Sequence, residues 1–246
     1  METFADIDRQ WKSKVPHESD FFFFRNVIVD SPMIVDVGAN AGQSVASFDA
    51  TCPGGRIVSF EPNERYRDVL EHIKSDLVSD GRFQYHMVGC GKSSALLDLH
   101  VPYVGGEPYF QEASLSADHF QIDWVRERLL SYGGELTFRS FQITIEPVDD
   151  FNLSPHLCKI DAEGWEFDVL QGMTSTISRQ APIFLIENND YNQVTAFLGD
   201  RGYRAYEYIA AENRVEPLSR ATANSFYLRP DHARWLVADV ARGILA

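Results

Sequence analysis

Acidic residues stand at the ends of short apolar runs in this chain, in a pattern typical of carboxylates gathered at one edge of a parallel sheet. Four of them occupy such positions, namely Asp36, Glu61, Asp161 and Glu187. In open α/β sheets, ligands bind beyond the carboxyl ends of the strands. Carboxylates placed there can accept ribose hydroxyls, hold a cation or take up a proton. The sequence therefore predicts a site built from strand-end acids.

A glycine-bearing turn follows the first of these runs. Gly38 and Gly42 flank Asn40, and Ser44 opens a predicted helix over residues 44–50. A glycine has no Cβ, so a ligand can lie directly against the main chain of such a turn. The turn nevertheless lacks the G-x-G-x-x-G pattern that places a pyrophosphate at a helix amino terminus. We therefore expect a ligand without phosphates.

S-adenosylmethionine has the character that this turn requires, because it joins adenosine to a cationic sulfonium and an amino-acid tail. We expect Asp36 and neighbouring main-chain groups to hold the tail and Glu61 to accept the ribose hydroxyls. The adenine edge is expected against residues 88 and 89. The predicted donor-binding residues are Asp36, Gly38, Asn40, Gly42, Ser44, Glu61, Val88 and Gly89.

The elements that must position these residues alternate between strand and helix. Strands are predicted over residues 33–37, 56–60, 83–88, 157–161 and 182–186. Apolar residues at helical spacing predict intervening helices, including residues 64–78, 165–177 and 191–201. This order predicts a doubly wound parallel sheet. Residues 203–209 and 224–228 are expected to form further strands side by side, before a terminal helix capped by Asp231.

The 246 residues suit a single α/β domain. Residues 1–30 are expected to form a helical lead-in followed by an extended piece, and residues 21–24 are expected to cover one edge of the core rather than to contact ligand. Residues 103–134 break the core pattern, and we expect an insertion that acts as a lid over the acceptor. Its predicted helix, residues 118–132, has an apolar side formed by Phe120, Trp124 and Leu129 or Leu130.

Composition narrows the function classes. The formal net charge of −14 disfavours nucleic acid as a partner, since phosphate neutralisation needs clustered Lys and Arg. Three widely spaced cysteines favour a reducing compartment. The apolar residues 21–24 fall well short of the ~20 that a membrane span needs, and the first residues lack the basic start of a signal peptide. We expect a cytoplasmic protein, and the sequence leaves its oligomeric state open.

Four motifs occur in an order that carries a family resemblance. They are Asp36-Val37-Gly38-Ala39-Asn40-Ala41-Gly42, Phe60-Glu61-Pro62, Val148-Asp149-Asp150-Phe151 and Lys159-Ile160-Asp161-Ala162-Glu163-Gly164-Trp165-Glu166. Together they resemble the FkbM family of S-adenosylmethionine-dependent methyltransferases over roughly residues 33–190. The resemblance implies a Rossmann-like class I methyltransferase fold with a mostly parallel seven-stranded sheet and helices on both faces. It also implies methyl transfer to a hydroxyl of a sugar, polyketide or related natural product.

Such a transfer needs an in-line displacement at the sulfonium methyl by an alcohol oxygen, which loses its proton as the methyl group moves. Asp161 and Glu163 are the predicted catalytic residues, as a base or as groups that orient the acceptor. His119, within the insertion, is a weaker candidate base. Asp161 with Glu187 and Asn188 would offer Mg²⁺ the oxygen ligands that it prefers. We favour catalysis without a metal, because strand-end carboxylates are common in its absence.

Other functions remain open at this stage. A nicotinamide-dependent oxidoreductase is disfavoured by the missing third glycine of the turn. Amino-group methylation of nucleic-acid bases is disfavoured by the acidity of the chain and by the lack of an Asn/Asp-Pro-Pro-Tyr motif. A non-catalytic binding module on the same fold would be expected to have lost the strand-end acids, all of which are present.

Overall fold

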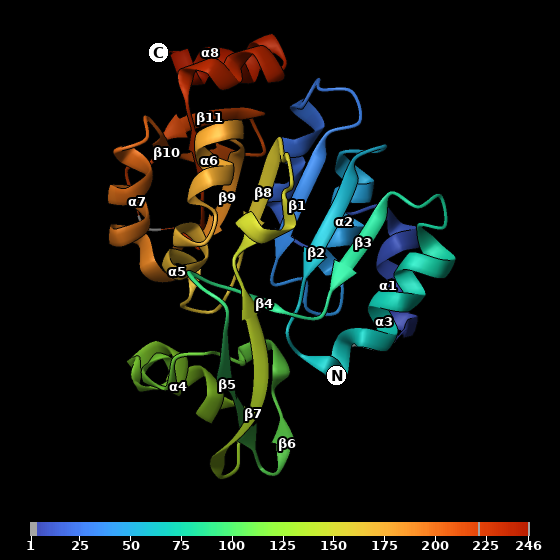
Figure 1. Ribbon diagram of the computed structural model, residues 1–246, viewed down its shortest axis with the longest axis vertical. Helices are drawn as coiled ribbons and strands as arrows, with labels where there is room; N and C mark the ends of the chain where they lie inside the picture. Colours follow the sequence, from blue (N-terminus) through green and yellow to red (C-terminus); the bar gives the residue numbers. More distant parts are fainter. Residues whose placement is uncertain (1–3, 221, 246) are drawn as a thin grey trace.

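The computed structural model describes residues 4–220 and 222–245, and a large sheet runs through its centre (Figure 1). This sheet has eight strands in the order β11-β10-β12-β9-β8-β1-β2-β3. The strands are β1 (Met33–Val37), β2 (Arg56–Phe60), β3 (Phe83–His86), β8 (Leu157–Ile160), β9 (Ile183–Glu187), β10 (Arg204–Ile209), β11 (Arg214–Pro217) and β12 (Asn224–Leu228). The neighbours from β9 to β3 pair in parallel, whereas β12 runs antiparallel to both β9 and β10. The predicted mostly parallel sheet is confirmed.

The predicted strand count of seven was wrong by one. The additional strand, β11, pairs antiparallel with β10 at the edge of the sheet. Its sequence, Arg214-Val215-Glu216-Pro217, has one apolar residue and ends in proline. Edge strands tolerate such a composition because only one side must pair. The adjacent pairing of β10 and β12 agrees with the prediction.

Helical segments cover both faces of the sheet (Figure 1). On the first face lie α1 (Phe4–Ser13), η1 (Ser19–Asn26), α2 (Gln43–Thr51), η2 (Glu64–Tyr66), α3 (Arg67–His72), η3 (Ile73–Leu77), η8 (Pro230–Trp235) and α8 (Ala238–Leu245). On the second lie η6 (Val148–Phe151), α5 (Glu166–Gln171), α6 (Thr174–Gln180) and α7 (Tyr191–Gly199). Within the described residues, no helix is long and apolar enough to cross a membrane.

The alternation of side chains along each strand divides the core in two. Ile34 packs into the core of the first face, whereas Val35 packs into that of the second. The same alternation sends Asp36 to the first face, where the register places it opposite Ser59 of β2 and Lys159 of β8. Three polar side chains are therefore brought together inside the sheet's first face by period and register alone.

The residues after β3 build a second, four-stranded sheet of order β4-β7-β5-β6, which forms the lower lobe in Figure 1. Its strands are β4 (Gly89–Cys90), β5 (Ala95–Val104), β6 (Glu107–Pro108) and β7 (Leu136–Glu146). The long β5 and β7 pair antiparallel, and between them lie η4 (Phe110–Glu112), η5 (Ala117–Gln121) and α4 (Asp123–Ser131). The segment 103–134 is thus the outer part of a larger lobe, because Tyr103 and Val104 still belong to β5.

Some local predictions were wrong in detail. Residues 21–24 lie in the helical segment η1 rather than in an extended piece, and Phe21, Phe23 and Phe24 are buried in the core. The predicted helix of residues 118–132 is divided into η5 and α4. Its buried residues include Val125, whereas Trp124 and Leu130 are exposed.

Two further helix predictions need correction. The helix expected over residues 165–177 is broken between α5 and α6 at Gly172, where a Cβ would lie 1.9 Å from the Gly91 carbonyl oxygen. At the carboxyl end, η8 begins after Arg229, and the main-chain N–H of Arg229 donates to Nδ1 of His232. Asp231 therefore does not cap this segment, because it already lies within it.

Gly38 is the point at which the β1–α2 turn touches the end of β8. Its φ is +80°, and a Cβ would lie 1.8 Å from the main-chain oxygen of Asp161. Gly54 has a similar φ of +86° but has no atom within 4 Å of its Cβ position. We expect Gly54→Ala to destabilise the protein only by the left-handed backbone term, roughly 1–2 kcal/mol.

Gly38→Ala should destabilise the protein more than Gly54→Ala, because the main chain of Asp161 must also move. Chemical denaturation of the two variants measures the difference. Equal losses in the free energy of unfolding would contradict the tight packing of the turn against β8.

Candidate active site

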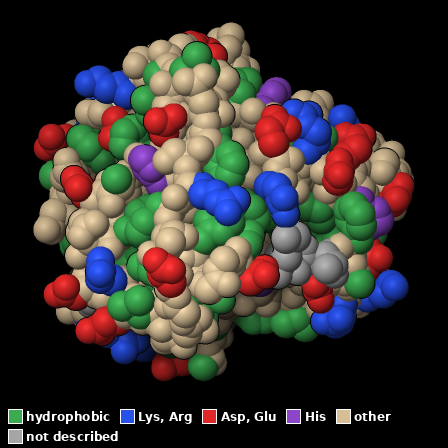
Figure 2. Space-filling view, turned by 90° about the horizontal axis from the view of Figure 1, so that it is seen from below, with side chains coloured by type: hydrophobic (Ala, Val, Ile, Leu, Met, Phe, Trp, Pro, Cys, Tyr) green, Lys and Arg blue, Asp and Glu red, His purple; other side chains and the backbone are tan. Residues whose placement is uncertain are grey.

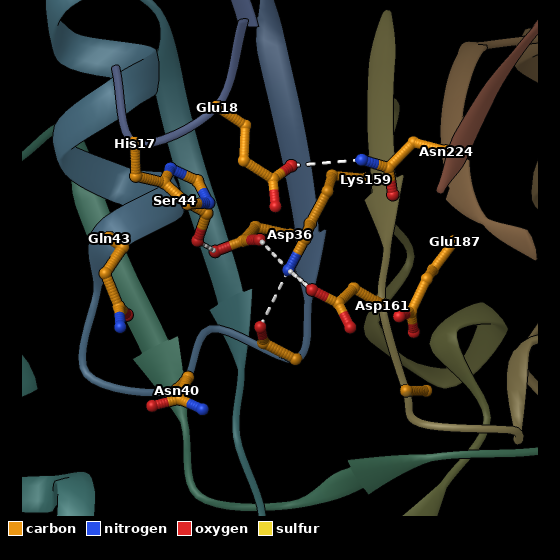
Figure 3. Close-up of polar contacts among 12 residues, drawn as sticks. His17, Glu18, Asp36, Asn40, Gln43, Ser44, Lys159, Asp161, Glu187 and Asn224 are labelled. Carbon is orange, nitrogen blue, oxygen red and sulfur yellow. Dashed lines mark hydrogen bonds and ion pairs between the residues drawn. The ribbon is translucent and has the colours of Figure 1, made fainter. Parts of the chain in front are cut away.

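A buried ammonium group joins the turn to the strand ends. Nζ of Lys159 donates to the main-chain oxygen of Gly38 at 2.8 Å, and lies 3.2 Å from Oδ2 of Asp161 and 3.7 Å from Oδ1 of Asp36 (Figure 3). Burial alone would lower the pKa of Lys159, but the carboxylates of Asp161 and Asp36 outweigh it and raise the pKa. Lys159 is therefore charged, and it draws β1 and β8 together at the site.

Asp36 itself is fully buried beneath the turn. Its Oδ2 accepts hydrogen bonds from the hydroxyls of Ser44 and Ser59, each at 2.8 Å. Asp36 therefore does not reach the ligand side of the turn. It supports the site indirectly, through its ion pair with Lys159 and its hydrogen bond with Ser44 at the start of α2.

Glu61 follows β2 and supports the turn from the other side. Its Oε2 accepts the main-chain N–H of Asn40 at 2.8 Å, and its Oε1 accepts that of Asn63 at 2.8 Å. Burial raises the pKa of Glu61 to about 7, against the opposing effect of these two hydrogen bonds. Each oxygen keeps a lone pair, since a carboxylate oxygen can accept two hydrogen bonds. The group can thus hold the turn and bind a ligand hydroxyl together.

A cavity of about 110 Å³ lies over these strand ends, between the main sheet and the lower lobe. The main sheet and its loops contribute apolar and polar walls, including Phe60, Glu61 and Trp165. The lower lobe contributes Leu99, Phe110, Gln111, Ala113 and Leu115. The site is therefore shared between the two sheets.

The lead-in crosses the other side of the same strand ends. Oε2 of Glu18 accepts a hydrogen bond from Nδ2 of Asn224 at 3.0 Å (Figure 3). Nδ1 of His17 lies 2.7 Å from Oγ of Ser47. Burial, and then the negative charge of Asp161, raise the pKa of Glu18. Burial, and then Lys159, lower the pKa of His17 to about 4. Both side chains therefore share an electrostatic environment with the strand-end charges.

Three carboxylates converge beside the cavity. One oxygen of each of Asp161, Glu163 and Glu187 lies within 4.8 Å of the others. Burial, and then repulsion from Asp161, raise the pKa of Glu163 to about 9 and that of Glu187 well above its ordinary value. Glu163 also has a left-handed main chain, with φ of 49°, which is rare for a residue with a side chain. The loop after β8 holds this strained geometry at the site.

The loop is organised by Glu166, which opens α5. Oε1 of this fully buried carboxylate accepts the main-chain N–H groups of Ala162 and Gly164 at 3.0 and 3.1 Å. Oγ of Ser114, from the lower lobe, donates to the main-chain oxygen of Glu163 at 2.7 Å. The position of Glu163 thus depends on both lobes.

The residues expected from the sequence divide into two groups. Those that line the cavity are Gly38, Asn40, Glu61, Gly89, Asp161 and Glu163. Those that do not line it are Asp36, Gly42, Ser44, Val88, Glu187 and Asn188. Gly42 precedes α2 with φ of +90°, and a Cβ there would meet Ile73. Nδ2 of Asn188 donates to Thr222 and Ser225, which ties β9 to the start of β12.

Sequence reasoning missed the contribution of His17 and Glu18. Both precede β1 by more than a dozen residues and lie in no recognisable motif. It also gave little weight to His119, which the lower lobe brings to 3.7 Å from Oε2 of Glu163. The sequence indicated these residues only by their ionisable side chains. The groups that surround them in the fold come from distant parts of the chain, which no local pattern predicts.

Comparison with known proteins agrees with this architecture. Residues 36–205 match the family model of the methyltransferase FkbM domain. No protein of curated function matches the chain. Among solved structures, a methyltransferase FkbM from Methylobacillus flagellatus KT is similar, with a TM-score of 0.53 and 18% identity. The match covers 87% of this chain and 48% of that protein, so the chain spans about half the length of this relative.

Two other methyltransferases show weaker similarity. A precorrin-6y C5,15-methyltransferase from Geobacter metallireducens GS-15 has a TM-score of 0.44 and 10% identity, covering 85% of this chain and 83% of that one. An S-adenosylmethionine-dependent O-methyltransferase from Thermotoga maritima has a TM-score of 0.43 and 12% identity, covering 92% and 70%.

The family match spans most of the parallel sheet, the turn, the lower lobe and the loop that carries Asp161 and Glu163. The sheet order and the similar solved structure confirm the class I methyltransferase fold that the sequence predicted. This chain belongs to the FkbM methyltransferase family.

Proposed function

We propose that the protein transfers a methyl group from S-adenosylmethionine to a hydroxyl of a small molecule or glycan. One observation carries the proposal: Asp161 and Glu163 line the same cavity as the turn of Gly38 and Asn40, which lacks a phosphate-binding pattern. Glu61, which can accept hydrogen bonds from ribose hydroxyls, lines that cavity too. The proposed donor site and a proton-accepting group thus border one cavity, as a direct methyl transfer to oxygen requires.

The donor is proposed to lie along the turn. Glu61 accepts the ribose hydroxyls with the lone pairs left by Asn40 and Asn63. The adenine lies toward Phe60 and Gly89, where the cavity is partly apolar. Lys159 and Asp36 hold the turn in place. We therefore propose that these two residues position the main chain that binds the donor and do not contact the donor themselves.

The amino-acid tail is proposed to extend toward the lead-in. There Lys159 is flanked by the carboxylates of Asp36, Asp161 and Glu18, so acidic groups exceed the one ammonium. An excess of negative charge suits the ammonium and sulfonium groups of S-adenosylmethionine. Glu18 is the group on the outer side, and we propose that it binds the donor ammonium.

The reaction is an in-line displacement. The acceptor oxygen forms a bond to the methyl carbon, the carbon–sulfur bond breaks with its electron pair left on sulfur, and the hydroxyl proton passes to the carboxylate of Asp161. Glu163, which its pKa of about 9 keeps protonated near neutral pH, orients the acceptor. Alignment of oxygen, carbon and sulfur supplies much of the rate enhancement, and proton transfer contributes ~10²–10⁴-fold.

The outer part of the lower lobe, residues 103–134, is proposed to act as a lid over the acceptor within a single methyltransferase domain. It supplies Phe110, Gln111, Ala113 and Leu115 to the cavity wall. Exposed large apolar side chains also concentrate on this lobe, including Trp124, Phe138 and Phe141. These surfaces support an acceptor with apolar as well as hydroxyl-bearing parts.

Nucleic acid is not the proposed acceptor. On the face shown in Figure 2, Lys and Arg side chains are interspersed with Asp and Glu and with apolar patches. The net charge of −14 adds an unfavourable long-range field for polyanions. The three cysteines are buried thiols, which supports a reducing, cytoplasmic setting as part of the proposal.

The proposal is tested by donor binding and label transfer. Calorimetry should show that S-adenosylmethionine binds and that NADH does not. Incubation with methyl-labelled donor and fractionated sugar, polyketide or glycoside extracts should place the label on an oxygen, as determined by mass spectrometry and NMR. Label found on nitrogen or carbon would contradict O-methyl transfer, and binding of NADH alone would contradict the donor.

Glu61 is expected to make donor binding depend on pH. Its protonation below about pH 7 removes hydrogen-bond acceptors for the ribose, so affinity should fall as the pH falls. Glu61→Gln should bind the donor more weakly by roughly 10–100-fold above pH 7, the effect of a lost charged hydrogen bond of ~1.5–3 kcal/mol.

The readout is the dissociation constant of S-adenosylmethionine for Glu61→Gln divided by that for the unsubstituted chain. Both constants are measured by calorimetry from pH 6 to pH 8.5. Titration of the donor's own amino group cancels in this ratio, so the remaining pH dependence reports the ionisation of Glu61 in the field of Lys159 and Asp36. The ratio should shrink toward acid pH. A ratio near one at every pH would remove Glu61 from the ribose site.

The lead-in offers a matched pair of variants. Glu18 and Asp20 both accept a hydrogen bond from Asn224, but only Glu18 is coupled electrostatically to Lys159 and Asp161. We expect Glu18→Gln to weaken S-adenosylmethionine binding roughly tenfold, and Asp20→Asn to leave it nearly unchanged. Equal effects in calorimetry would show that the lead-in acts only as a support.

A further inference from the structure

The three carboxylates beside the cavity come from two strand ends and point toward a common centre. Asp161 and Glu163 follow β8, and Glu187 ends β9. One oxygen of each lies within 4.8 Å of the others. Carboxylates this close repel one another, and a shared proton or a bound cation relieves that repulsion.

The positive charges acting on this group come from Lys159 and from Arg128, which acts on Glu163 electrostatically but forms its own ion pair with Glu112. Lys159 contacts Asp161 at 3.2 Å, and the same ammonium also serves Gly38 and Asp36. Oε2 of Glu187 accepts a hydrogen bond from the neutral amide of Asn189. The charge of the group is therefore matched by a divalent cation better than by the ammonium of Lys159.

An independent feature on the lower lobe points to the same place. His119 of η5 is only 3% exposed, and its Nε2 has no hydrogen-bond partner among the described residues. This nitrogen lies 3.7 Å from Oε2 of Glu163, too far for a hydrogen bond. Two atoms bound ~2.1 Å from one ion stand between ~3 and ~4.2 Å apart, depending on the angle between them. The distance from His119 to Glu163 lies within this range, but His119 is outside the group of three whose ligand atoms are all within 4.8 Å of one another, so it would have to move toward the other two carboxylates to become a ligand.

We propose that Asp161, Glu163 and Glu187 bind a divalent cation, with Nε2 of His119 as a fourth ligand supplied by the lower lobe. Three carboxylates and one imidazole suit Mn²⁺, with Mg²⁺ as the alternative of the same class. This donor set differs from the one expected from the sequence, because Glu163 and His119 take part and the amide of Asn188 is directed to β12 through its Nδ2.

The cation would have two consequences. It would tie η5 to the strand ends, since its ligands come from both lobes, and so hold the proposed lid closed over the cavity. Its part in the reaction rests on the proposed O-methyl transfer, for which a cation held by these residues would make the proton of the acceptor hydroxyl more acidic. The binding site itself can be tested without donor, acceptor or turnover.

The test uses the full chain after treatment with a chelator. Mn²⁺ is then added, and the free Mn²⁺ is measured by electron paramagnetic resonance. The difference between added and free ion should correspond to one bound Mn²⁺ per chain, and Mg²⁺ should displace it. Glu163→Gln and Glu187→Gln should each weaken Mn²⁺ binding at least tenfold, and His119→Ala should weaken it roughly 10–100-fold.

His100→Ala is the matched control, because His100 lies on β5 of the same lobe and bonds Ser140 at an exposed position. It should bind Mn²⁺ as the unsubstituted chain does. Absence of Mn²⁺ and Mg²⁺ binding at millimolar concentration would overturn the site, and so would equal affinities in all four variants. Thermal unfolding of each variant without metal separates loss of the site from loss of the fold.

Hydrogen exchange tests the contribution of the lower lobe. Mn²⁺ should slow exchange at the amides of residues 113–122 in the unsubstituted chain, and should do so less in His119→Ala. Binding without such protection would overturn His119 as a ligand. Because S-adenosylmethionine binding is measured separately, a chain that binds donor but no Mn²⁺ would reject the metal site and leave the proposed function standing.

Discussion

The buried ammonium of Lys159 is the interaction on which the site depends. It holds the Gly38 carbonyl, Asp36 and Asp161 at the meeting point of β1 and β8. A buried pair that loses one partner leaves an uncompensated charge, which typically costs ~3–5 kcal/mol. Lys159 thus allows an acidic cluster to exist inside the sheet edge, and the turn that faces the cavity takes its position from the same contact.

The site is a composite of three chain segments that are distant in sequence. The main sheet provides the strand-end acids, the lead-in covers them at Glu18, and the lower lobe closes the cavity at Phe110 and Leu115. Loops and insertions vary more easily than the strands that carry them, so such an arrangement separates donor binding from acceptor choice. The two lobes meet at Glu163, whose main-chain oxygen is bound by Ser114.

The parts of the fold that were predicted correctly are those in which local pattern and burial agree. The central strands β1, β2, β8 and β9 were found because each is a short, mostly apolar run followed or ended by a polar residue, as at Ile57 to Glu61. Strand β11 was missed because an edge strand needs little apolar character. The break at Gly172 was missed because its cause is the close approach of Gly91, a residue 81 positions earlier in the chain.

By itself, the sequence determined the turn of Gly38 and Gly42, the strand-end acids and the alternation that turns Asp36, Ser59 and Lys159 to one face. These features follow from backbone periods and from the few residues that accept left-handed angles. Only the tertiary structure decided that Glu18 would lie over Lys159, and that His119 would reach Glu163. Such contacts join segments whose separation in sequence leaves no periodic trace, so they are set by how the lead-in and the lower lobe pack on the sheet.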